Sequence, residues 1–386
     1  MDISKHSLGS LPGRPDGGQA FATQESLETA LTEAHRDLHD RVLRTVLDAP
    51  PESTLTAAID ALVRFAAARP HTAQLLVGEA MGGGAPSQQL RAEGIAEIAQ
   101  MIERAYLAAP TQTLAPDLPT VGAIGGVYRL LDSMLHGEEP LKVQLGDELA
   151  TWLAGYERPL AQHRWRSLDA LPRPAVKTSL PPVESSPPED ERQRILLAAA
   201  EVTAQGYETA SEAAICAAAG IDETTFHRYF ADKRAAFKAV HEFHYQQVMS
   251  TTAGAFFSGE NWPERVWTAG AAFAGYMQAN PALLRATFVE GYAGGPPTLQ
   301  RGEDIVAAFT IFLQEGYQYL NGRDQPSRLA LAVIGATIFE IGYEGARLSP
   351  EPDIVGLLAP AVYVCLTPFL GAGATEELID AQLHAG

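Results

Sequence analysis

Cysteine is scarce in this sequence, and the two present, Cys216 and Cys365, cannot build a disulfide framework. Their scarcity favours a reducing cytoplasm as the location of the protein. No apolar run reaches about 18 uninterrupted residues, so we expect no helix that spans a membrane. Residues 1–18 lack an apolar core and do not resemble a signal peptide.

Basic residues are also few, since 28 Lys and Arg stand against 47 Asp and Glu, for a net charge of −19. This balance excludes a protein that coats nucleic acid, because such proteins carry an extended basic face. One local contact surface on an acidic body remains compatible with it. The 386 residues allow two or three domains, and 46% hydrophobic residues are enough to fill their cores.

Motifs of common enzymes are missing. The sequence has no phosphate-binding glycine loop, no nucleophile elbow and no cysteine–histidine metal pattern. The glycines at 82–84 lie between predicted helices and are interpreted as a turn. We therefore expect no catalytic residue, no cofactor and no metal, and an enzyme on this scaffold is only a third hypothesis.

What the sequence does have is a helix-turn-helix pattern over residues 191–240. Apolar residues recur at helical spacing from Ile195 to Val202, and Gly206 ends that helix. A short helix over about 211–218 is predicted to turn at Gly220, and Asp222 is placed to cap a third helix. Two helices joined by a tight glycine turn are typical of proteins whose second helix reads a major groove.

The same fifty residues resemble the DNA-binding module of the tetracycline-repressor (TetR) family. The resemblance rests on Arg-x-x-Ile-Leu-x-Ala-Ala, then Gly-Tyr, then Ile-Cys-Ala-Ala-Ala-Gly-Ile, then Thr-Thr-Phe-His-Arg-Tyr-Phe-Ala-Asp-Lys, in the order and near the spacing of the family. It implies an all-α fold and double-stranded operator DNA as a partner. The alternative from the residues alone is a three-helix bundle with no role in DNA binding.

By this resemblance, the exposed positions of the recognition helix face the bases. Phe226 and Phe230 are predicted to be core, and Cys216 to be a small buried residue. His227 departs from the family, which usually has an aromatic residue there, but a histidine can still donate to phosphate. The candidate DNA-binding residues are Ser211, Glu223, Thr224, Thr225, His227, Arg228, Tyr229 and Lys233, of which Ser211 and Lys233 are expected at phosphates.

The charge of this module opens an alternative. Residues 190–240 hold eight acidic and six basic side chains, a net charge of −2. DNA affinity comes largely from cations that neutralise phosphates, so weak non-specific binding is expected. Glu223 can accept from the amino group of cytosine and thereby specify a base, or it can mark a module that has lost DNA binding.

The rest of the chain contains an internal repeat. A shift of 211 positions overlays the stretch from Arg69 on the stretch from Asn280 without a gap, and a shift of 209 overlays Phe21 on Phe230. Such a repeat decides the architecture. The matches at 211 include Pro70 with Pro281, Glu79 with Glu290, Pro86 with Pro297 and Tyr106 with Tyr317.

The repeat predicts two TetR-like ligand and dimerisation domains, at 21–165 and 241–386, around a DNA-binding domain at 190–240. The first domain begins where its own helix-turn-helix would have ended, which a misassigned start codon or a shortened chain would also produce. Residues 1–20 are predicted to be disordered, and 166–189 to be a proline-rich linker. Helices are predicted over 24–48, 53–68, 71–80, 87–108, 119–136, 140–163, 233–257, 262–279, 281–291, 298–320, 326–347 and 352–370.

The second ligand domain is much richer in aromatic rings than the first. Apolar cavities lined by such rings are the usual sites of small molecules, although each single ring is as readily explained as core. The resemblance therefore implies a hydrophobic effector, aromatic or polyketide-like, in the second domain. The candidate ligand residues are Phe273, Tyr276, Met277, Phe288, Phe309, Phe312, Phe339 and Tyr343.

Two further pairs match across the repeat. Glu79 and Glu290 lie in apolar helices, where each needs a partner such as Arg285 or a ligand amine, unless it faces solvent. His35 and His244 lie near His39 and His241 at helical spacing, which suits zinc, but no third ligand is evident.

The sequence thus predicts a ligand-responsive repressor with one DNA-binding module per chain. The alternative is a TetR-fold protein that binds a ligand or a partner and has lost sequence-specific DNA binding. The family pairs its domains through their last two helices, here 119–163 and 326–370. These segments can pair within one chain as a pseudo-dimer, while a palindromic operator, which needs two modules about one turn apart, requires further association of chains.

Overall fold

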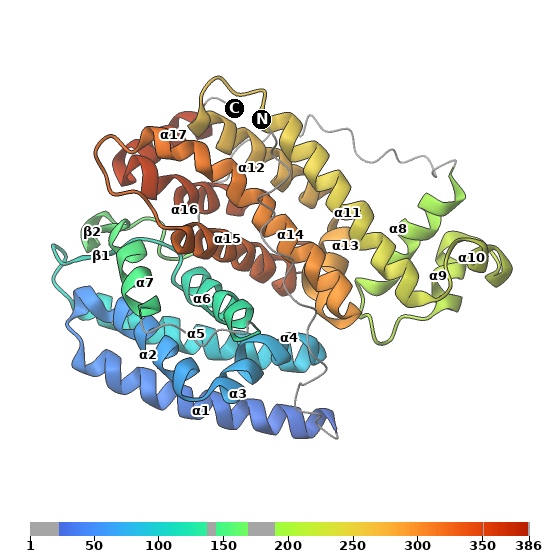
Figure 1. The fold of residues 1–386 in the computed structure, drawn as a ribbon, viewed down its shortest axis with the longest axis horizontal. Helices are drawn as coiled ribbons and strands as arrows, with labels where there is room; N and C mark the ends of the chain where they lie inside the picture. Colours follow the sequence, from blue (N-terminus) through green and yellow to red (C-terminus); the bar gives the residue numbers. More distant parts are fainter. Residues whose placement is uncertain (1–22, 137–143, 169–189, 350, 385–386) are drawn as a thin grey trace.

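The computed structural model describes residues 23–136, 144–168, 190–349 and 351–384, and it is an all-α protein, as predicted. The predicted N-terminal disorder over 1–20 and nearly all of the predicted linker lie outside the described residues. Helices α1–α7 form one unit, called here the N-terminal group, and α11–α17 form a second unit, the C-terminal group (Figure 1). Helices α8–α10, called the head, extend from the end of α11.

The N-terminal group begins with a capping box, because Thr23 and Ser26 satisfy each other's backbone N–H groups at the start of α1. Proline opens α3, where a missing N–H costs nothing. The elements are α1 (Gln24–Asp48), η1 (Pro51–Ser53), α2 (Thr54–Ala68), α3 (Pro70–Gln74), η2 (Leu75–Glu79), α4 (Ala80–Gly82), α5 (Gly84–Ala108), β1 (Leu114–Pro116), α6 (Thr120–Leu135), α7 (Leu145–Ala154), β2 (Glu157–Pro159) and η3 (Leu160–Gln162).

The head and the C-terminal group follow, and side-chain caps mark most of their long helices. Asp232, Asn261 and Ser327 each accept a backbone N–H at the start of α11, α12 and α15. The elements are α8 (Glu191–Thr203), α9 (Glu212–Ala219), α10 (Glu223–Tyr229), α11 (Lys233–Phe256), α12 (Trp262–Ala279), α13 (Pro281–Leu284), η4 (Arg285–Val289), η5 (Glu290–Gly294), α14 (Pro296–Leu313), η6 (Gln314–Tyr319), α15 (Arg328–Leu348), η7 (Val355–Leu357), α16 (Leu358–Leu370) and α17 (Ala372–His384).

Both groups interrupt a helix at a corresponding place. A short helix that begins at a proline widens into a π-helical turn, η2 in the N-terminal group and η4 in the C-terminal group. Single π-helical turns are uncommon and are often found at functional sites. In the C-terminal group, η4 supplies contacts to both the head and a cavity, as described below.

One expected helix differs from the structure, and one helix was not expected. The helix predicted over 140–163 is only ten residues long, and the chain then forms β2, which pairs antiparallel with β1 through Ala115 and Arg158. Proline at 159 fits an edge strand and cannot continue a helix. Helix α17 was not predicted, although Thr375 and Ile379 bury one side of it.

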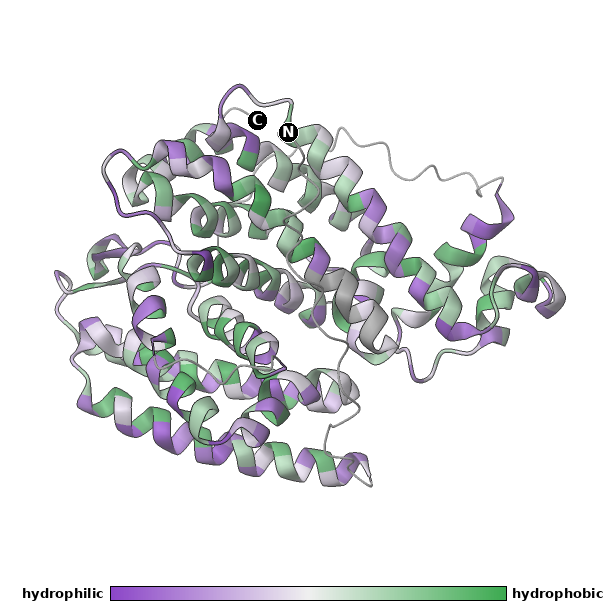
Figure 2. Cartoon of the chain, viewed as in Figure 1, coloured by the Kyte–Doolittle hydropathy of each residue, from purple (hydrophilic) through white to green (hydrophobic). Residues whose placement is uncertain are grey.

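The two groups pack through a pair of central helices, α6 and α15, which lie side by side in Figure 1. Hydrophobic residues concentrate on α6, α15 and α16, whereas α10 is mostly hydrophilic (Figure 2). Within the part of the chain that the structure describes, α15 alone has the length and composition of a membrane span. It is the core helix of this fold, because 72% of its most apolar stretch is buried.

A buried ion pair joins the two groups across this contact. Arg91 of α5 donates from Nη1 to Oε1 of Glu340 on α15 at 2.5 Å, and both side chains are 2% exposed. The guanidinium carbon of Arg91 also lies 5.5 Å from the ring centre of Tyr128 and 6.0 Å from that of Tyr343. The pair is therefore enclosed by aromatic rings from both groups, out of reach of bulk solvent.

Candidate nucleic-acid interface and ligand cavity

The head has the three helices and two turns that the sequence predicts. Ser211 caps α9 by accepting the N–H of Ala214 at 3.2 Å, and Asp222 caps α10 by accepting the N–H of Thr225 at 2.7 Å. Gly220 ends α9 in the left-handed conformation, with φ of 66°, which a residue with a side chain rarely adopts. This turn fixes the angle between the two helices.

Apolar side chains of the head hold α10 against α8 and α9. Phe226 is fully buried and Phe230 is 5% exposed, as predicted, and their ring centres lie 5.8 Å apart. Cys216, also predicted to be buried, packs in the same cluster, and burial raises the pKa of its thiol. These buried contacts fix the position of α10, so its outer face stays exposed to solvent.

Most of the predicted DNA-binding residues lie on the surface of the head. Thr225 does not, because its side chain is only 7% exposed and accepts a hydrogen bond from Nη2 of Arg228 at 2.6 Å. The expectation that Thr225 is an exposed base-reading residue is therefore wrong. The residues found exposed are Ser211, Glu223, Thr224, His227, Arg228 and Tyr229.

Lys233 is half-buried and already engaged. Its ammonium group donates to the carbonyl oxygens of Tyr207 at 2.9 Å and Ala210 at 3.0 Å, and it lies 4.3 Å from the Tyr207 ring centre. An ammonium has three donors. Lys233 thus holds the loop before α9 in place.

Two of the acidic residues are used within the head. Glu212 accepts the backbone N–H of Lys233 at 3.0 Å and lies 3.5 Å from Nε2 of His227. Glu191 accepts the Tyr229 hydroxyl at 2.9 Å, and this hydrogen bond, together with the charge of Glu191, raises the pKa of Tyr229. These contacts tie α8, α9 and α10 together, so both carboxylates have a structural role.

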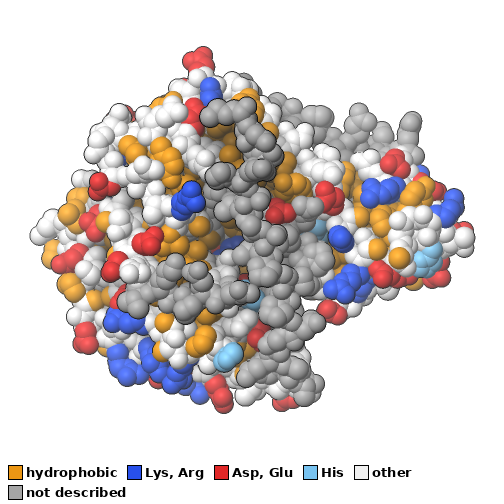
Figure 3. Space-filling view, in the orientation of Figure 1, with side chains coloured by type: hydrophobic (Ala, Val, Ile, Leu, Met, Phe, Trp, Pro, Cys, Tyr) orange, Lys and Arg blue, Asp and Glu red, His pale blue; other side chains and the backbone are white. Residues whose placement is uncertain are grey.

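Glu223 differs from them. It is exposed in the first turn of α10, and among the described residues it has no hydrogen bond or ion pair. On the face of the head seen in Figure 3, acidic and basic side chains are interspersed. Glu223 is therefore a carboxylate on the exposed surface of α10 that the contacts within the head do not use.

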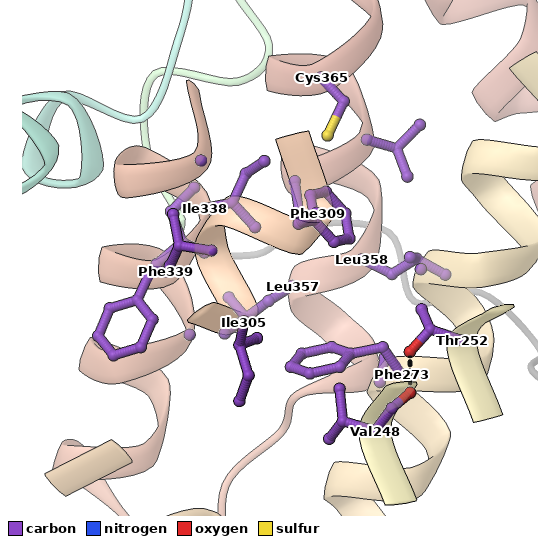
Figure 4. A pocket seen from close by; sticks show the side chains of 18 of the residues that line it. Val248, Thr252, Phe273, Ile305, Phe309, Ile338, Phe339, Leu357, Leu358 and Cys365 are labelled. Carbon is purple, nitrogen blue, oxygen red and sulfur yellow. Dashed lines mark hydrogen bonds between the residues drawn. The ribbon is translucent and has the colours of Figure 1, made fainter. Parts of the chain in front are cut away.

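The C-terminal group encloses an apolar cavity of about 90 Å³, counted as the space open to the centre of a water molecule. Helices α11, α12, α14, α15 and α16 and the turns η4 and η7 form its walls. Figure 4 shows side chains from these helices directed into the cavity, Phe273 and Phe309 among them. Thr252 is the clearest polar group, and its hydroxyl donates to the carbonyl of Val248.

Five of the eight predicted ligand residues line this cavity. They are Phe273, Phe288, Phe309, Phe312 and Phe339. The structure places Tyr276, Met277 and Tyr343 elsewhere, buried in the core of the C-terminal group. The two tyrosines and the methionine among the candidates are thus core residues, whereas every phenylalanine among them borders the cavity.

Aliphatic side chains make up much of the cavity wall, and the sequence analysis did not predict them as ligand residues. Val248, Ile305 and Leu357 come from α11, α14 and η7, and Cys365 from α16. Burial raises the pKa of the Cys365 thiol, so it remains neutral. A cavity wall and a packed core have the same helical periodicity, so no sequence signal separates them.

One segment links the cavity to the head. Phe288 of η4 lines the cavity, while Arg285 of the same turn donates to the carbonyl of Ala204 at the end of α8 and to that of Ala346 on α15. Glu290, which follows directly in η5, accepts the N–H of Tyr207 at 2.9 Å. Burial raises the pKa of Glu290, and the N–H of Tyr207 and the charge of Arg285 lower it.

The histidines that match across the repeat lie within helices, where His241 and His244 are buried and His35 and His39 are half-buried. Burial lowers the pKa of His244 to about 3 and that of His241 to about 4. His35 of the N-terminal group has a pKa lowered to about 4, by burial first and by the charge of Arg91 second. Within the described ranges, no three His, Cys, Asp or Glu side chains gather where they could hold a metal.

Comparisons with known proteins bear on the head. Residues 195–240 match the family model described as bacterial regulatory proteins, tetR family. No curated protein matches the sequence significantly.

Similar solved structures include the fatty acid degradation regulator FadR from Bacillus halodurans, at 19% identity and a TM-score of 0.42, over 46% of this chain and 96% of the other. A TetR-like transcriptional regulator from a Rhodococcus species has 17% identity and a TM-score of 0.34, over 49% and 96%. A TetR family transcriptional regulator from Chloroflexus aurantiacus has 21% identity and a TM-score of 0.33, over 51% and 94%. Similarity at these levels carries no argument, so the likeness to the bacterial regulatory proteins of the tetR family rests on residues 195–240 of the head.

Proposed function

We propose that this chain is a ligand-responsive transcriptional repressor that binds double-stranded operator DNA through its head and releases it when a hydrophobic small molecule enters the cavity of the C-terminal group. The match of residues 195–240 supports DNA binding. We further propose that the two groups are two copies of one ligand domain, paired within the chain as a pseudo-dimer, and that the protein works in the cytoplasm.

The observation that supports a ligand response is that one short segment both lines the cavity and holds the head by hydrogen bonds. Phe288 borders the cavity, and Arg285 and Glu290, within five residues of it along the chain, hold Ala204 and Tyr207 of the head. A ligand that displaces the Phe288 ring moves the backbone that carries both anchors. Release follows only if the ligand binds the displaced state more tightly than the DNA-bound state.

The cavity wall defines the class of effector. Its side chains are aliphatic and aromatic, and the Thr252 hydroxyl is already bonded to a carbonyl. A charged ligand would lose its hydration there without a compensating partner, which costs several kcal/mol. The effector is therefore an uncharged hydrocarbon-rich or aromatic compound.

The first experiment is binding of the purified protein to DNA from around its own gene, compared with scrambled DNA, over a range of salt concentrations. Specific binding that weakens as salt rises is expected. Absence of binding at low salt by a folded helical protein would overturn the proposal.

The coupling is tested with Glu290→Gln and a matched surface change, Glu315→Gln. Glu290→Gln weakens the anchor on Tyr207, so it is expected to retain DNA binding but to lose part of the release caused by hydrophobic compounds. Glu315→Gln alters a partly exposed ion pair with Arg265 and is expected to behave like the unaltered protein. Equal release in both variants would contradict a path through Glu290.

The alternative is a protein that retains the fold and a ligand but has lost sequence-specific DNA binding. The net charge of −2 on residues 190–240 and the engagement of Lys233 by two carbonyls favour it. Glu223→Lys separates the two functions. In a DNA-reading head this change alters which sequence is bound, whereas in a head without specificity it only raises binding to every sequence and steepens the salt dependence by about one charge.

A further inference from the structure

Helix α6 carries three glycines on the side that faces α15. A β-carbon added at Gly126 would lie 2.8 Å from the backbone nitrogen of Thr337, and one added at Gly122 would lie 2.8 Å from Cγ1 of Ile341. At Gly125 it would collide with the side chain of Glu340. The α6 backbone thus approaches α15 more closely than any side chain on α6 would permit.

The opposite side of this contact is built differently. Helix α15 inserts Thr337, Glu340 and Ile341, all at most 1% exposed, into the hollows that the α6 glycines leave. The order along the two helices is opposite, so they run antiparallel. We call this contact, from Gly122–Gly126 on α6 to Thr337–Ile341 on α15, the α6–α15 seam.

The seam is complementary but not symmetric. An isologous contact between two chains places the same surface on itself and therefore needs self-complementarity. The α15 surface facing another α15 would set bulky side chains against bulky side chains. The Glu340 carboxylate would also lose Arg91, which comes from α5, and an unpaired buried charge costs several kcal/mol.

Part of the outer surface of α16 and α17 is also covered by the N-terminal group. Trp165, which is fully buried, stacks on Tyr363 of α16 with ring centres 5.0 Å apart. Tyr156 donates to the carbonyl of Val364 at 2.7 Å, and Arg158 pairs with Glu376 of α17 at 2.5 Å. The segment after α7 thus packs on α16 and on the Glu376 side of α17, next to the seam.

We infer from this arrangement that the chain acts as a single unit with one head, and that its DNA target is one isolated half-site without an inverted partner. The inference deepens the proposed function and rests on it for the role of the head. A regulator with two heads reads half-sites about one helical turn apart. Here the helices through which two chains would pair are covered by the N-terminal group of the same chain, so no second head is brought to a fixed spacing.

The test has two arms, and the first needs no DNA. Light scattering after size exclusion, over a roughly hundredfold range of protein concentration, is expected to give the mass of one chain, 41.3 kDa, throughout. A mass of two chains, or a mass that doubles as concentration rises, would overturn the inference while leaving the proposed function standing.

The second arm selects binding sites from duplexes that hold about two helical turns of random sequence. The expected result is one enriched block, shorter than a helical turn and without an inverted copy, bound by one chain per duplex. An enriched inverted repeat bound by two chains would refute the isolated half-site. If the chain has the mass of one copy but enriches no sequence, the proposed function itself fails, and the half-site fails with it.

Glu340→Lys probes the role of the seam in this stoichiometry. It places a second cation beside Arg91 and is expected to open the seam, with chains that associate or lose helicity at lower urea. Glu315→Lys makes the same charge change on the surface and is expected to remain a single chain. If Glu340→Lys also retains the mass and stability of the unaltered chain, the seam does not set the stoichiometry.

Discussion

Removing one partner of the Arg91–Glu340 pair is expected to destabilise the protein more than any change to its surface ion pairs. In Arg91→Met the Glu340 carboxylate stays buried without a cation, which costs about 3–5 kcal/mol.

The measurement is urea unfolding followed by circular dichroism at pH 7. Arg265→Met, which breaks a pair whose side chains are 28% and 33% exposed, serves as the control and should cost less than about 1 kcal/mol. The double variant Arg91→Met with Glu340→Leu removes both charges and should cost less than Arg91→Met alone. The reasoning is refuted if Arg91→Met costs no more than the control, or if the double variant costs the sum of its single changes.

Three further predictions concern stability. The pKa of His244 falls from 6.5 to about 3 on folding, so below pH 6.5 the unfolded chain takes up a proton that the folded chain does not. The free energy of unfolding should therefore fall by about 2 kcal/mol between pH 7.5 and pH 5 because of this residue. In His244→Leu, the difference between the urea midpoints measured at these two pH values should be smaller by the corresponding amount. Asp222→Ala should lower the free energy of unfolding, measured by thermal unfolding, by about 1 kcal/mol, whereas Asp222→Asn, which still caps α10, should change it little. Equal losses of stability in the two variants would argue against the capping role of Asp222. Gly126→Ala should lower the free energy of unfolding by about 1–3 kcal/mol, because the added methyl group clashes with Thr337. The control Gly254→Ala places its methyl group in open space on α11 and should raise the free energy of unfolding by up to about 1 kcal/mol. A stabilising effect of Gly126→Ala would contradict the close approach of the two helices in the seam.

The sequence predicted those parts of the fold whose signals are local. Helix α1 begins and ends where periodicity placed it, and Ser211, Gly220 and Asp222 each perform the capping or turning role expected of them. Such features depend on a few neighbouring residues and on backbone geometry alone. The failed helix over 140–163 shows the limit, because pairing with β1, some forty residues earlier, overrode its local pattern.

The site was predictable only in part, for a related reason. Thr225 shares the polar character of its exposed neighbours, and its burial follows from how α10 leans on the head core. Phe273 and Tyr276 are three residues apart on α12, yet one lines the cavity and the other does not. The partner of Arg91 lies 249 residues away, and nothing in either segment indicates the other.

The unequal seam bears on how this chain can vary. In a dimer of identical chains, each substitution at the contact appears twice, once on each side, and must suit both. Here the glycines of α6 and the bulky residues of α15 belong to different positions of one chain, so each changes alone. One helix can therefore carry small residues while the other carries the large side chains that fill the space. In the same way, one group can supply the cation, Arg91, and the other the anion, Glu340. A mutation at Gly126 and its compensation at Thr337 are inherited together, because a single gene encodes both sides of the contact.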